Sequence, residues 1–155
     1  MKIEYVKGDA TSPSCEGNKI IVHVCNDIGG WGRGFVLAIS AKWKDPEENY
    51  RSWYLSGINF GLGEAQFVKV ESDIWVANLI GQRDIKPGKD GIPPIRYAAV
   101  AMALDKVADK TLELTASVHM PRIGCGLAGG TWDKMEEIVL EKLTNKGIEV
   151  TVYDL

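Results

Sequence analysis

Glycine dominates the stretch 121–130, which reads PRIGCGLAGG. Four of the seven residues from Gly124 to Gly130 are glycine, so side chains leave their backbone N–H groups uncovered. The apolar run 117–120 before the loop predicts a buried strand, and residues 131–143 after it predict a helix. A glycine loop at the start of a helix is typical of phosphate binding, because the free N–H groups and the helix end both attract an anion.

A second glycine loop, Gly29–Gly34, also lies between a predicted strand and a predicted helix. A pyrophosphate beside Arg33 would meet the positive end of the helix that begins near Phe35. Two such loops in one small domain indicate a diphosphate ligand. We expect Trp31 to lie at an exposed loop tip and to cover a sugar, with burial in the core as the alternative. Arg33 either contacts phosphate or is simply a solvated charge.

Residues 124–129 also match the G-x-G-x-x-G pattern of dinucleotide-binding sites. Such a site requires an acidic residue about 20 positions later and further strand–helix–strand units. Only one helix and one strand are predicted after the loop, so a Rossmann site is not expected. Taken alone, the pattern favours a glycine turn that packs a helix on a sheet. The companion loop, Gly29–Gly34, shifts the balance toward phosphate binding.

A few polar side chains outside the loops are candidates for chemistry. Asp9 follows the first strand and either forms a turn or accepts a hydrogen bond from an adenine amino group. His23 lies in mid-strand and Asn26 ends that strand at the expected ligand edge. His23 is therefore either a satisfied core residue or one that orients a water or a ribose hydroxyl. His119 and Cys125 are interpreted as structural, because the sequence supplies no polar partner for the first and no base for the second.

Composition limits the classes of function. A chain of 155 residues with 45% hydrophobic residues is expected to form one domain, residues 1–155. The net charge of −3 gives no broad basic field for nucleic acid or a membrane surface. Three cysteines without a CxxC pair, and no signal peptide, indicate a reducing cytoplasm. The two histidines lack metal-ligand spacing, so no metal site is expected.

Strands and helices alternate along the chain in the order β-β-α-α-β-β-α-β-α-β. The predicted strands are 2–7, 19–25, 65–71, 74–80, 117–123 and 148–153, and the predicted helices are 35–43, 45–56, 94–108 and 131–143. Asp45 is expected to cap the second helix, with Pro46 at its first position. This order predicts an α/β fold with three layers and a mixed, largely parallel sheet, whose antiparallel edge is a hairpin. Ligands of such sheets bind at the carboxyl ends of the strands, where both glycine loops lie.

Several of these motifs together resemble the macrodomain family, whose members bind ADP-ribose. The resemblance covers nearly the whole chain. It rests on residues 5–9 (YVKGD), residues 23–35 (HVCNDIGGWGRGF), residues 120–127 (MPRIGCGL) with Trp132, and residues 150–155 (VTVYDL). It implies a three-layer α/β/α macrodomain with a six-stranded central sheet, and ADP-ribose or an ADP-ribosylated substrate as the partner. It implies no cofactor, and the chain is expected to act as a monomer.

The resemblance also implies roles for individual residues. His23 and Asn26 would be catalytic at the distal ribose. The residues implied to bind ADP-ribose are Asp9, Ala10, Asn26, Gly30, Trp31, Gly32, Arg33, Gly34, Phe35, Gly124, Cys125, Gly126, Leu127, Ala128, Gly129, Tyr153 and Leu155.

The chain is most similar to the macrodomain branch that contains phosphatases of ADP-ribose-1''-phosphate and terminal ADP-ribose glycohydrolases. The glycohydrolase mechanism uses a lysine and an aspartate at positions that hold Gln82 and Ala128 here. Glutamine forms no covalent adduct with the ribose aldehyde, and alanine offers no carboxylate. The predicted function is therefore ADP-ribose binding with hydrolysis of a substituent at the distal ribose, either a phosphate or an ADP-ribosylated side chain. The alternative is a reader that binds ADP-ribose without catalysis.

Overall fold

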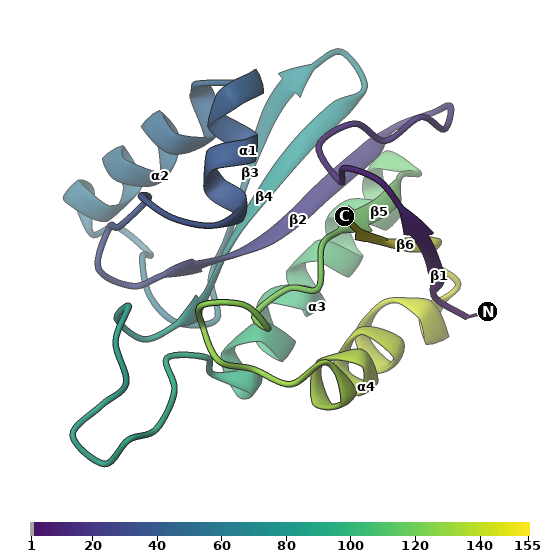
Figure 1. The fold of residues 1–155 in the computed structure, drawn as a ribbon. Helices are drawn as coiled ribbons and strands as arrows, with labels where there is room; N and C mark the ends of the chain where they lie inside the picture. Colours follow the sequence, from purple (N-terminus) through teal and green to yellow (C-terminus); the bar gives the residue numbers. More distant parts are fainter. Residues whose placement is uncertain (1) are drawn as a thin grey trace.

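The computed structural model describes residues 2–155 and has a six-stranded sheet with helices on both faces (Figure 1). The strands are β1 (Glu4–Lys7), β2 (Lys19–Asn26), β3 (Ala65–Glu71), β4 (Ile74–Gln82), β5 (Ser117–Met120) and β6 (Val150–Asp154). The helices are α1 (Phe35–Lys42), α2 (Asp45–Ser56), α3 (Tyr97–Leu114), α4 (Trp132–Lys142) and a short 3₁₀ turn (Thr144–Lys146). The predicted order of strands and helices is confirmed.

The strands lie in the order β1-β6-β5-β2-β4-β3. All neighbouring pairs are parallel except β3 and β4, which form the predicted antiparallel hairpin. The sheet is therefore mixed and largely parallel, as expected for a chain in which helices connect most of the strands. β2 lies near its centre, and its residues are buried or half-buried and mostly apolar.

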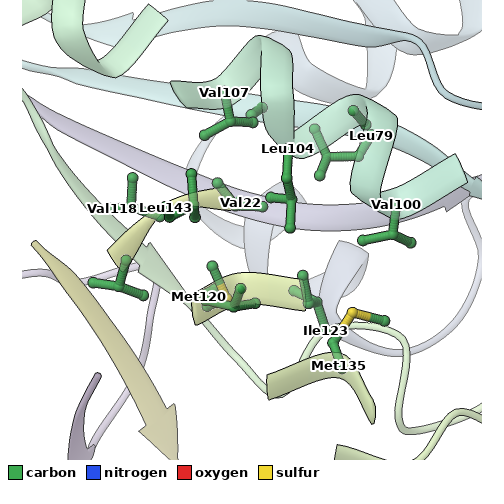
Figure 2. Packing of buried hydrophobic residues seen from close by; sticks show 14 of the residues in the cluster. Val22, Leu79, Val100, Leu104, Val107, Val118, Met120, Ile123, Met135 and Leu143 are labelled. Carbon is green, nitrogen blue, oxygen red and sulfur yellow. The ribbon is translucent and has the colours of Figure 1, made fainter. Parts of the chain in front are cut away.

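Two hydrophobic clusters hold the three layers together. Helices α3 and α4 cover one face, where Leu104 and Met135 pack against Val22 and Val118 (Figure 2). Helices α1 and α2 cover the β2–β4 part of the other face, where Ile39 and other apolar residues form the second cluster (Figure 1). At about 25 cal/mol per Å² of buried apolar surface, each fully buried aliphatic side chain contributes roughly 2 kcal/mol.

The helices match the predicted bounds to within one residue except at α3, and the predicted cap of α2 is wrong. Helix α2 begins at Asp45 itself, with Lys44 as its N-cap and no side-chain capping bond, so the expected Asp45 cap is wrong. Helix α3 begins three residues after Pro94, because the Pro94 carbonyl accepts from the Arg83 N–H and Ile95 bridges to the end of β4. Its apolar stripe continues past residue 108, so the helix ends only at Leu114.

The segment 83–96 between β4 and α3 projects from the body of the fold (Figure 1). Its base is closed by the Arg83–Pro94 backbone hydrogen bond of 2.8 Å. Within residues 2–155, none of the helices is long and apolar enough to span a membrane.

Candidate functional site

A cleft of about 460 Å³ lies between the two glycine loops. It is bordered by the carboxyl ends of β2, β4 and β5, where parallel strands of α/β sheets place their ligands. Its lining residues are His23, Val24, Arg33, Gly34, Phe35, Val36, Ala38, Gln82, Pro121, Arg122, Ile123, Gly124, Gly126, Leu127, Ala128 and Leu155. Chain segments far apart in sequence thus converge on one site.

The Asn26 side chain shapes the first glycine loop from within. Its Nδ2 donates to the Gly30 carbonyl at 2.9 Å. Its Oδ1 accepts from the N–H groups of Ile28 at 3.0 Å and Gly30 at 2.9 Å, and from the Tyr50 hydroxyl at 2.9 Å. Asn26 does not line the cleft. Its geometry therefore supports a positioning role, and the catalytic role stays a prediction.

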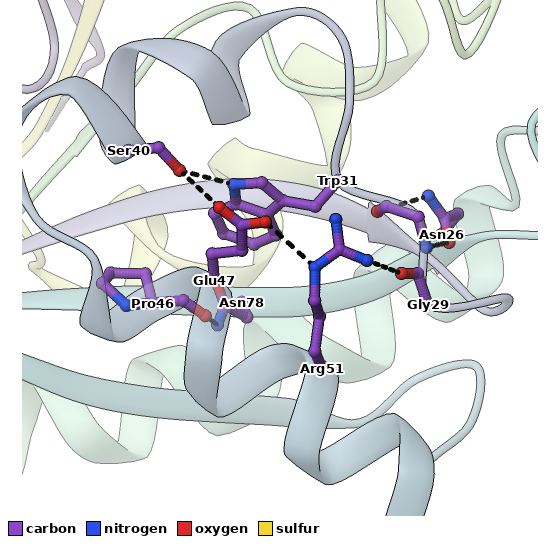
Figure 3. Close-up of polar contacts among 9 residues, drawn as sticks. Asn26, Gly29, Trp31, Ser40, Pro46, Glu47, Arg51 and Asn78 are labelled. Atoms are coloured by element: carbon purple, nitrogen blue, oxygen red, sulfur yellow. Dashed lines mark hydrogen bonds and ion pairs between the residues drawn. The ribbon is translucent and has the colours of Figure 1, made fainter.

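Helix α2 supports the same loop from outside (Figure 3). Arg51 donates to the Gly29 carbonyl at 3.0 Å and forms an ion pair with Glu47 at 2.9 Å. Gly29 has φ +78, and a Cβ there would lie 2.5 Å from the Tyr54 ring. The loop is therefore packed directly on α2 and has its shape before any ligand arrives.

Trp31 lies inside the molecule, so the predicted exposed position is wrong. Its side chain is 4% exposed, and its indole N–H donates to the Ser40 hydroxyl at 2.8 Å. The ring packs edge-on against His23, at 5.3 Å between ring centroids, and lies tilted by 40° against Tyr50, at 5.4 Å. The alternative interpretation, that Trp31 is buried in the core, is confirmed, because its wide indole fills the space between β2 and α2. Trp31 supports the cleft from behind and does not line it.

His23 contributes to the inner wall of the cleft and is 2% exposed. Its Nε2 lies 2.5 Å from the Asn78 Oδ1, while the Asn78 Nδ2 donates to the Pro46 carbonyl and to Gln66. An amide oxygen only accepts, so the His23 Nε2–H donates and Nδ1 keeps its lone pair. Burial lowers the pKa of His23 to about 4, although the Asn78 bond opposes this shift. The imidazole is therefore neutral at pH 7.

The second glycine loop is shaped by backbone bonds. The Gly130 N–H donates to the Gly124 carbonyl at 2.8 Å, and the Gly129 N–H donates to the Gly126 carbonyl at 3.1 Å. A Cβ at Gly130 would lie 2.5 Å from the Gly124 oxygen. In contrast, a Cβ at Gly126 would meet no atom within 4 Å. Gly126 therefore faces open space in the cleft, where a ligand can approach its backbone closely.

Cys125 is half-buried within this loop and does not line the cleft. Its Sγ donates to the Ile123 carbonyl at 3.4 Å, and burial raises the pKa of its thiol. A raised pKa leaves the sulfur protonated and weakly nucleophilic. These observations agree with the structural interpretation.

The start of α1 offers N–H groups to the cleft. Its N-cap is Gly34, at φ 81, and no side chain caps this helix end. Unbonded N–H groups at a helix start attract anions. Arg33 also lines the cleft and forms no ion pair with any residue of the described range 2–155. The cleft thus has a positive edge in an acidic protein.

Arg122 is a lining residue that the sequence analysis missed. Its guanidinium donates twice to Asp154, at 2.7 and 3.0 Å, and lies over the rings of Tyr5 and Trp132 at 5.2 and 5.4 Å. The bidentate pair ties the second loop to the end of β6, next to Leu155. Its position directly before the glycine loop could have indicated that Arg122 lines the cleft. No sequence pattern indicated that Val36 and Ala38 of α1 line it.

Several predicted residues lie away from the cleft lining. The predicted residues that line it are His23, Arg33, Gly34, Phe35, Gly124, Gly126, Leu127, Ala128 and Leu155. Those that do not are Asp9, Ala10, Asn26, Gly30, Trp31, Gly32, Cys125, Gly129 and Tyr153. The Asp9 Oδ1 accepts from the N–H and the hydroxyl of Thr11, at 2.8 and 2.7 Å, so one carboxylate oxygen forms the predicted turn.

No protein-family model matches the chain. A protein of unknown function from Bacteroides thetaiotaomicron has a solved structure that covers 100% of this chain and 99% of its own, with 61% identity and a TM-score of 0.99. The macrodomain protein from Streptomyces coelicolor is 54% identical, with 99% of each chain covered and a TM-score of 0.89.

Curated relatives agree with this match. The ADP-ribose 1''-phosphate phosphatase of Lodderomyces elongisporus is 28% identical over 99% of this chain and 100% of its own length. The chromodomain-helicase-DNA-binding protein 1-like of Danio rerio is 30% identical over 97% of this chain, but the chain spans only 15% of that protein. Fold, topology and the full-length match at 54% identity lead to one conclusion: the chain belongs to the macrodomain family.

Proposed function

We propose that the protein binds ADP-ribose in the cleft between its two glycine loops. The observation that carries this proposal is the position of the cleft at the carboxyl edge, with glycine backbone on both sides. The diphosphate would lie between the start of α1 at Gly34 and the loop at Gly124 and Gly126. Backbone N–H groups would hold it, because they bind an anion without requiring a positive net charge.

The direction of the ligand follows from the two ends of the cleft. His23 and Gln82 lie at the end formed by β2 and β4, and Leu155 follows β6. In this proposal the distal ribose lies toward His23 and Gln82, while the adenosine lies toward Leu155 and Asp9. A volume of about 460 Å³ is of the size that holds a small-molecule ligand.

Calorimetric titration tests the binding. ADP-ribose is expected to bind with a dissociation constant on the order of micromolar. AMP and ribose 5-phosphate, which each carry only one of the two phosphates, are expected to bind at least about tenfold more weakly, a loss of about 1.4 kcal/mol. Equal affinity for AMP and ADP-ribose would show that the two loops do not hold a diphosphate.

Hydrolysis at the distal ribose is the second candidate function. The full-length relative from Lodderomyces elongisporus is named an ADP-ribose 1''-phosphate phosphatase, and this name favours the reaction. His23 is neutral at pH 7, and its Nδ1 keeps a lone pair that could accept a hydrogen bond from the attacking water and orient it. The water oxygen would bond to the phosphorus atom as the bond from phosphorus to the ribose oxygen breaks, and a proton from the water would pass to that ribose oxygen.

A turnover assay separates the enzyme from the reader. The assay supplies ADP-ribose-1''-phosphate and, separately, ADP-ribosylated protein, and follows released phosphate or ADP-ribose. Under the hydrolase proposal, His23→Gln lowers kcat by at least about tenfold with little change in ADP-ribose affinity. A protein that binds ADP-ribose but converts neither substrate is a reader.

The proposal also covers the domain organisation, the oligomeric state and the location of the protein. We infer that residues 1–155 act as one domain, as a monomer and in the cytoplasm, on ADP-ribose or an ADP-ribosylated target and not on nucleic acid. Three free cysteines support a reducing compartment. The net charge of −3 argues against nucleic acid as the ligand. Analytical ultracentrifugation at micromolar protein concentration would test whether the protein is a monomer.

A further inference from the structure

The segment 83–96 between β4 and α3 is bonded to the chain on both sides of the cleft. Near its start, the Asp84 N–H donates to the carboxylate of Asp27, just before the first glycine loop, at 2.7 Å. Near its end, the Ile95 N–H donates to the carbonyl of Ala128, within the second glycine loop, at 3.1 Å. The base of the segment therefore lies at the rim of the cleft, next to both loops.

Gln82 connects this segment to the end of the cleft where the distal ribose is proposed to lie. Gln82 lines the cleft, and its Nε2 donates to the Asp84 carbonyl at 2.9 Å. None of the residues 83–96 lines the cleft, and the segment projects away from the sheet and helices (Figure 1). ADP-ribose ends at its distal ribose. In the proposed orientation, a group attached to that ribose extends toward the segment.

Hydrogen bonds give the tip of the segment a defined shape. The Gly88 N–H donates to the Ile92 carbonyl at 3.0 Å, and the Gly91 N–H donates to the Gly88 carbonyl at 2.9 Å. The Asp90 carboxylate accepts from the Ile92 N–H at 3.1 Å. These bonds close a hairpin-like turn. A surface that already has its shape loses less conformational entropy when a partner binds.

The segment is positively charged, whereas the whole chain has a net charge of −3. Its charge is +2, from Arg83, Lys86, Lys89 and Arg96 against Asp84 and Asp90. Both lysines are exposed, and neither forms an ion pair with any residue of the described range 2–155. Both aspartate carboxylates, in contrast, accept hydrogen bonds from backbone N–H groups of the segment itself. The lysine charges are therefore available to an acidic partner.

Two large aliphatic side chains of the segment are also exposed. Ile85 is 53% exposed and Ile92 is 50% exposed. They lie on opposite sides of the turn that Gly88 and Gly91 close. Apolar side chains surrounded by charged ones are typical of protein–protein interfaces, in which the centre is apolar and the rim is polar.

We propose that the segment 83–96 is a docking surface for the protein to which ADP-ribose is attached, and that it selects acidic target segments. This inference rests on the proposed binding of ADP-ribose and concerns the part of the substrate beyond the distal ribose. Lys86 and Lys89 pair with Asp and Glu side chains of the target, and Ile85 and Ile92 contact its apolar side chains. Complementary charge also discriminates against basic targets.

Calorimetric titration with two ADP-ribosylated peptides tests the docking surface. Each peptide carries ADP-ribose on a central cysteine through an S-glycosidic bond, and mass spectrometry after the titration confirms that it is intact. The peptides differ only in the flanking residues, which are Asp and Glu in one and Lys in the other. At low salt the acidic peptide is expected to bind at least about fivefold more tightly than free ADP-ribose, and the lysine peptide more weakly. High salt should reduce this difference, because it screens exposed charges.

The double variant Lys86→Glu, Lys89→Glu is expected to reverse the preference between the two peptides. Its affinities for free ADP-ribose and for ADP-ribose-1''-phosphate should stay within about twofold of the wild type. The matched control, Lys44→Glu with Lys69→Glu, makes the same change in net charge at exposed lysines that do not line the cleft. It should bind both peptides like the wild type, and thermal unfolding confirms that each variant is folded.

Titration with free ADP-ribose distinguishes a failure of this inference from a failure of the proposed function. Wild-type protein that binds free ADP-ribose but has equal affinity for both peptides overturns the docking surface alone. So does a folded Lys86→Glu, Lys89→Glu variant that keeps the wild-type preference. The same variant losing affinity for ADP-ribose-1''-phosphate as strongly as for the acidic peptide would make the segment a phosphate contact instead. Wild-type protein that binds no ADP-ribose overturns the proposed function, and the docking surface with it.

Discussion

The two glycine loops border one cleft but are held in different ways. Side chains hold the first loop, since Asn26 bonds it from within and Tyr50 and Arg51 of α2 bond it from outside. Backbone bonds and close packing hold the second loop, through the Gly130–Gly124 hydrogen bond. Both loops contain glycines that have no room for a side chain, and the first loop depends in addition on hydrogen bonds from side chains.

The two loops therefore tolerate different substitutions. In the first loop, the critical residue is an asparagine whose partners lie up to 24 residues away. In the second loop, the critical residues are Gly130 and Gly124, where a Cβ would meet atoms at 2.5 or 2.6 Å. Gly29 of the first loop is packed as tightly, since a Cβ there would lie 2.5 Å from the Tyr54 ring. Substitutions in each loop test whether the two loops differ in this way.

Gly130→Ala is expected to have the largest effect. The new Cβ would lie 2.5 Å from a backbone oxygen that cannot move without opening the loop. We expect a loss of about 3 kcal/mol or more in the free energy of unfolding, at the upper end for overpacking. Urea unfolding measures it, and Gly32→Ala, with no atom within 4 Å of the new Cβ, is the matched control. Equal stability of the two variants would remove the packing argument.

Lowering the pH is expected to reduce the free energy of unfolding through His23, which packs against Trp31 of the first glycine loop. Because His23 is buried and its folded pKa of about 4 lies below the unfolded value, the unfolded chain binds more protons between these values. Stability is therefore full above about pH 6.5 and falls as the pH drops toward 4. The loss is at most about 3 kcal/mol for this histidine.

Unfolding curves at several pH values check the acid effect. His119 contributes in the same window, since its pKa is also about 4. His23→Gln should therefore flatten the pH dependence by about half, and a variant with unchanged slope would contradict the assignment. Hydrogen exchange of the backbone amides would show which of the two glycine loops opens first as the pH is lowered.

Asn26→Ala is expected to lower the free energy of unfolding by about 2 kcal/mol, because several buried partners lose a hydrogen bond. The loop would lose its shape, so ADP-ribose affinity should fall together with stability. The comparable change in the second loop, Cys125→Ala, removes one weak bond from sulfur to the Ile123 carbonyl. We expect it to change stability by less than about 1 kcal/mol. A reversed order of the two effects, measured by urea unfolding, would contradict the comparison.

Arg122→Ala is expected to have the smallest effect on stability. The Arg122–Asp154 pair is bidentate, but both side chains are 40% exposed. Such pairs contribute on the order of 0.5 kcal/mol, and salt screens them. Thermal unfolding at low and high salt should show a small difference that salt removes. A loss above about 2 kcal/mol would mean that the second loop also depends on side-chain support.

The fold could be predicted from the sequence because its signals are local. Apolar β-branched runs such as 19–25 mark buried strands, and Gly57, at φ 67, ends α2 as expected. Both glycine loops border the cleft, because parallel strands bring their carboxyl ends to one edge. These features depend on residues close together in the chain.

The errors arose where distant residues decide. Trp31 fills a space between His23 and Tyr50, which no local pattern reveals. The hydrogen bonds of the Asn26 amide to the loop and to Tyr50 were likewise not predictable, while its role at the ligand stays a prediction. The sequence offers no polar partner near His119, and folding brings the Tyr153 hydroxyl to its Nδ1 from 34 residues away. Such contacts follow from the sheet order, which the sequence indicates only in outline.

The most direct test of the ADP-ribose proposal is calorimetry on Gly126→Val beside Gly61→Ala. A Cβ at either glycine meets no atom within 4 Å, but Gly126 lines the cleft and Gly61 does not. We predict that Gly126→Val weakens ADP-ribose binding by at least about tenfold, or 1.4 kcal/mol, at unchanged thermal stability, while Gly61→Ala binds like the wild type. Wild-type affinity in a folded Gly126→Val variant would contradict the account.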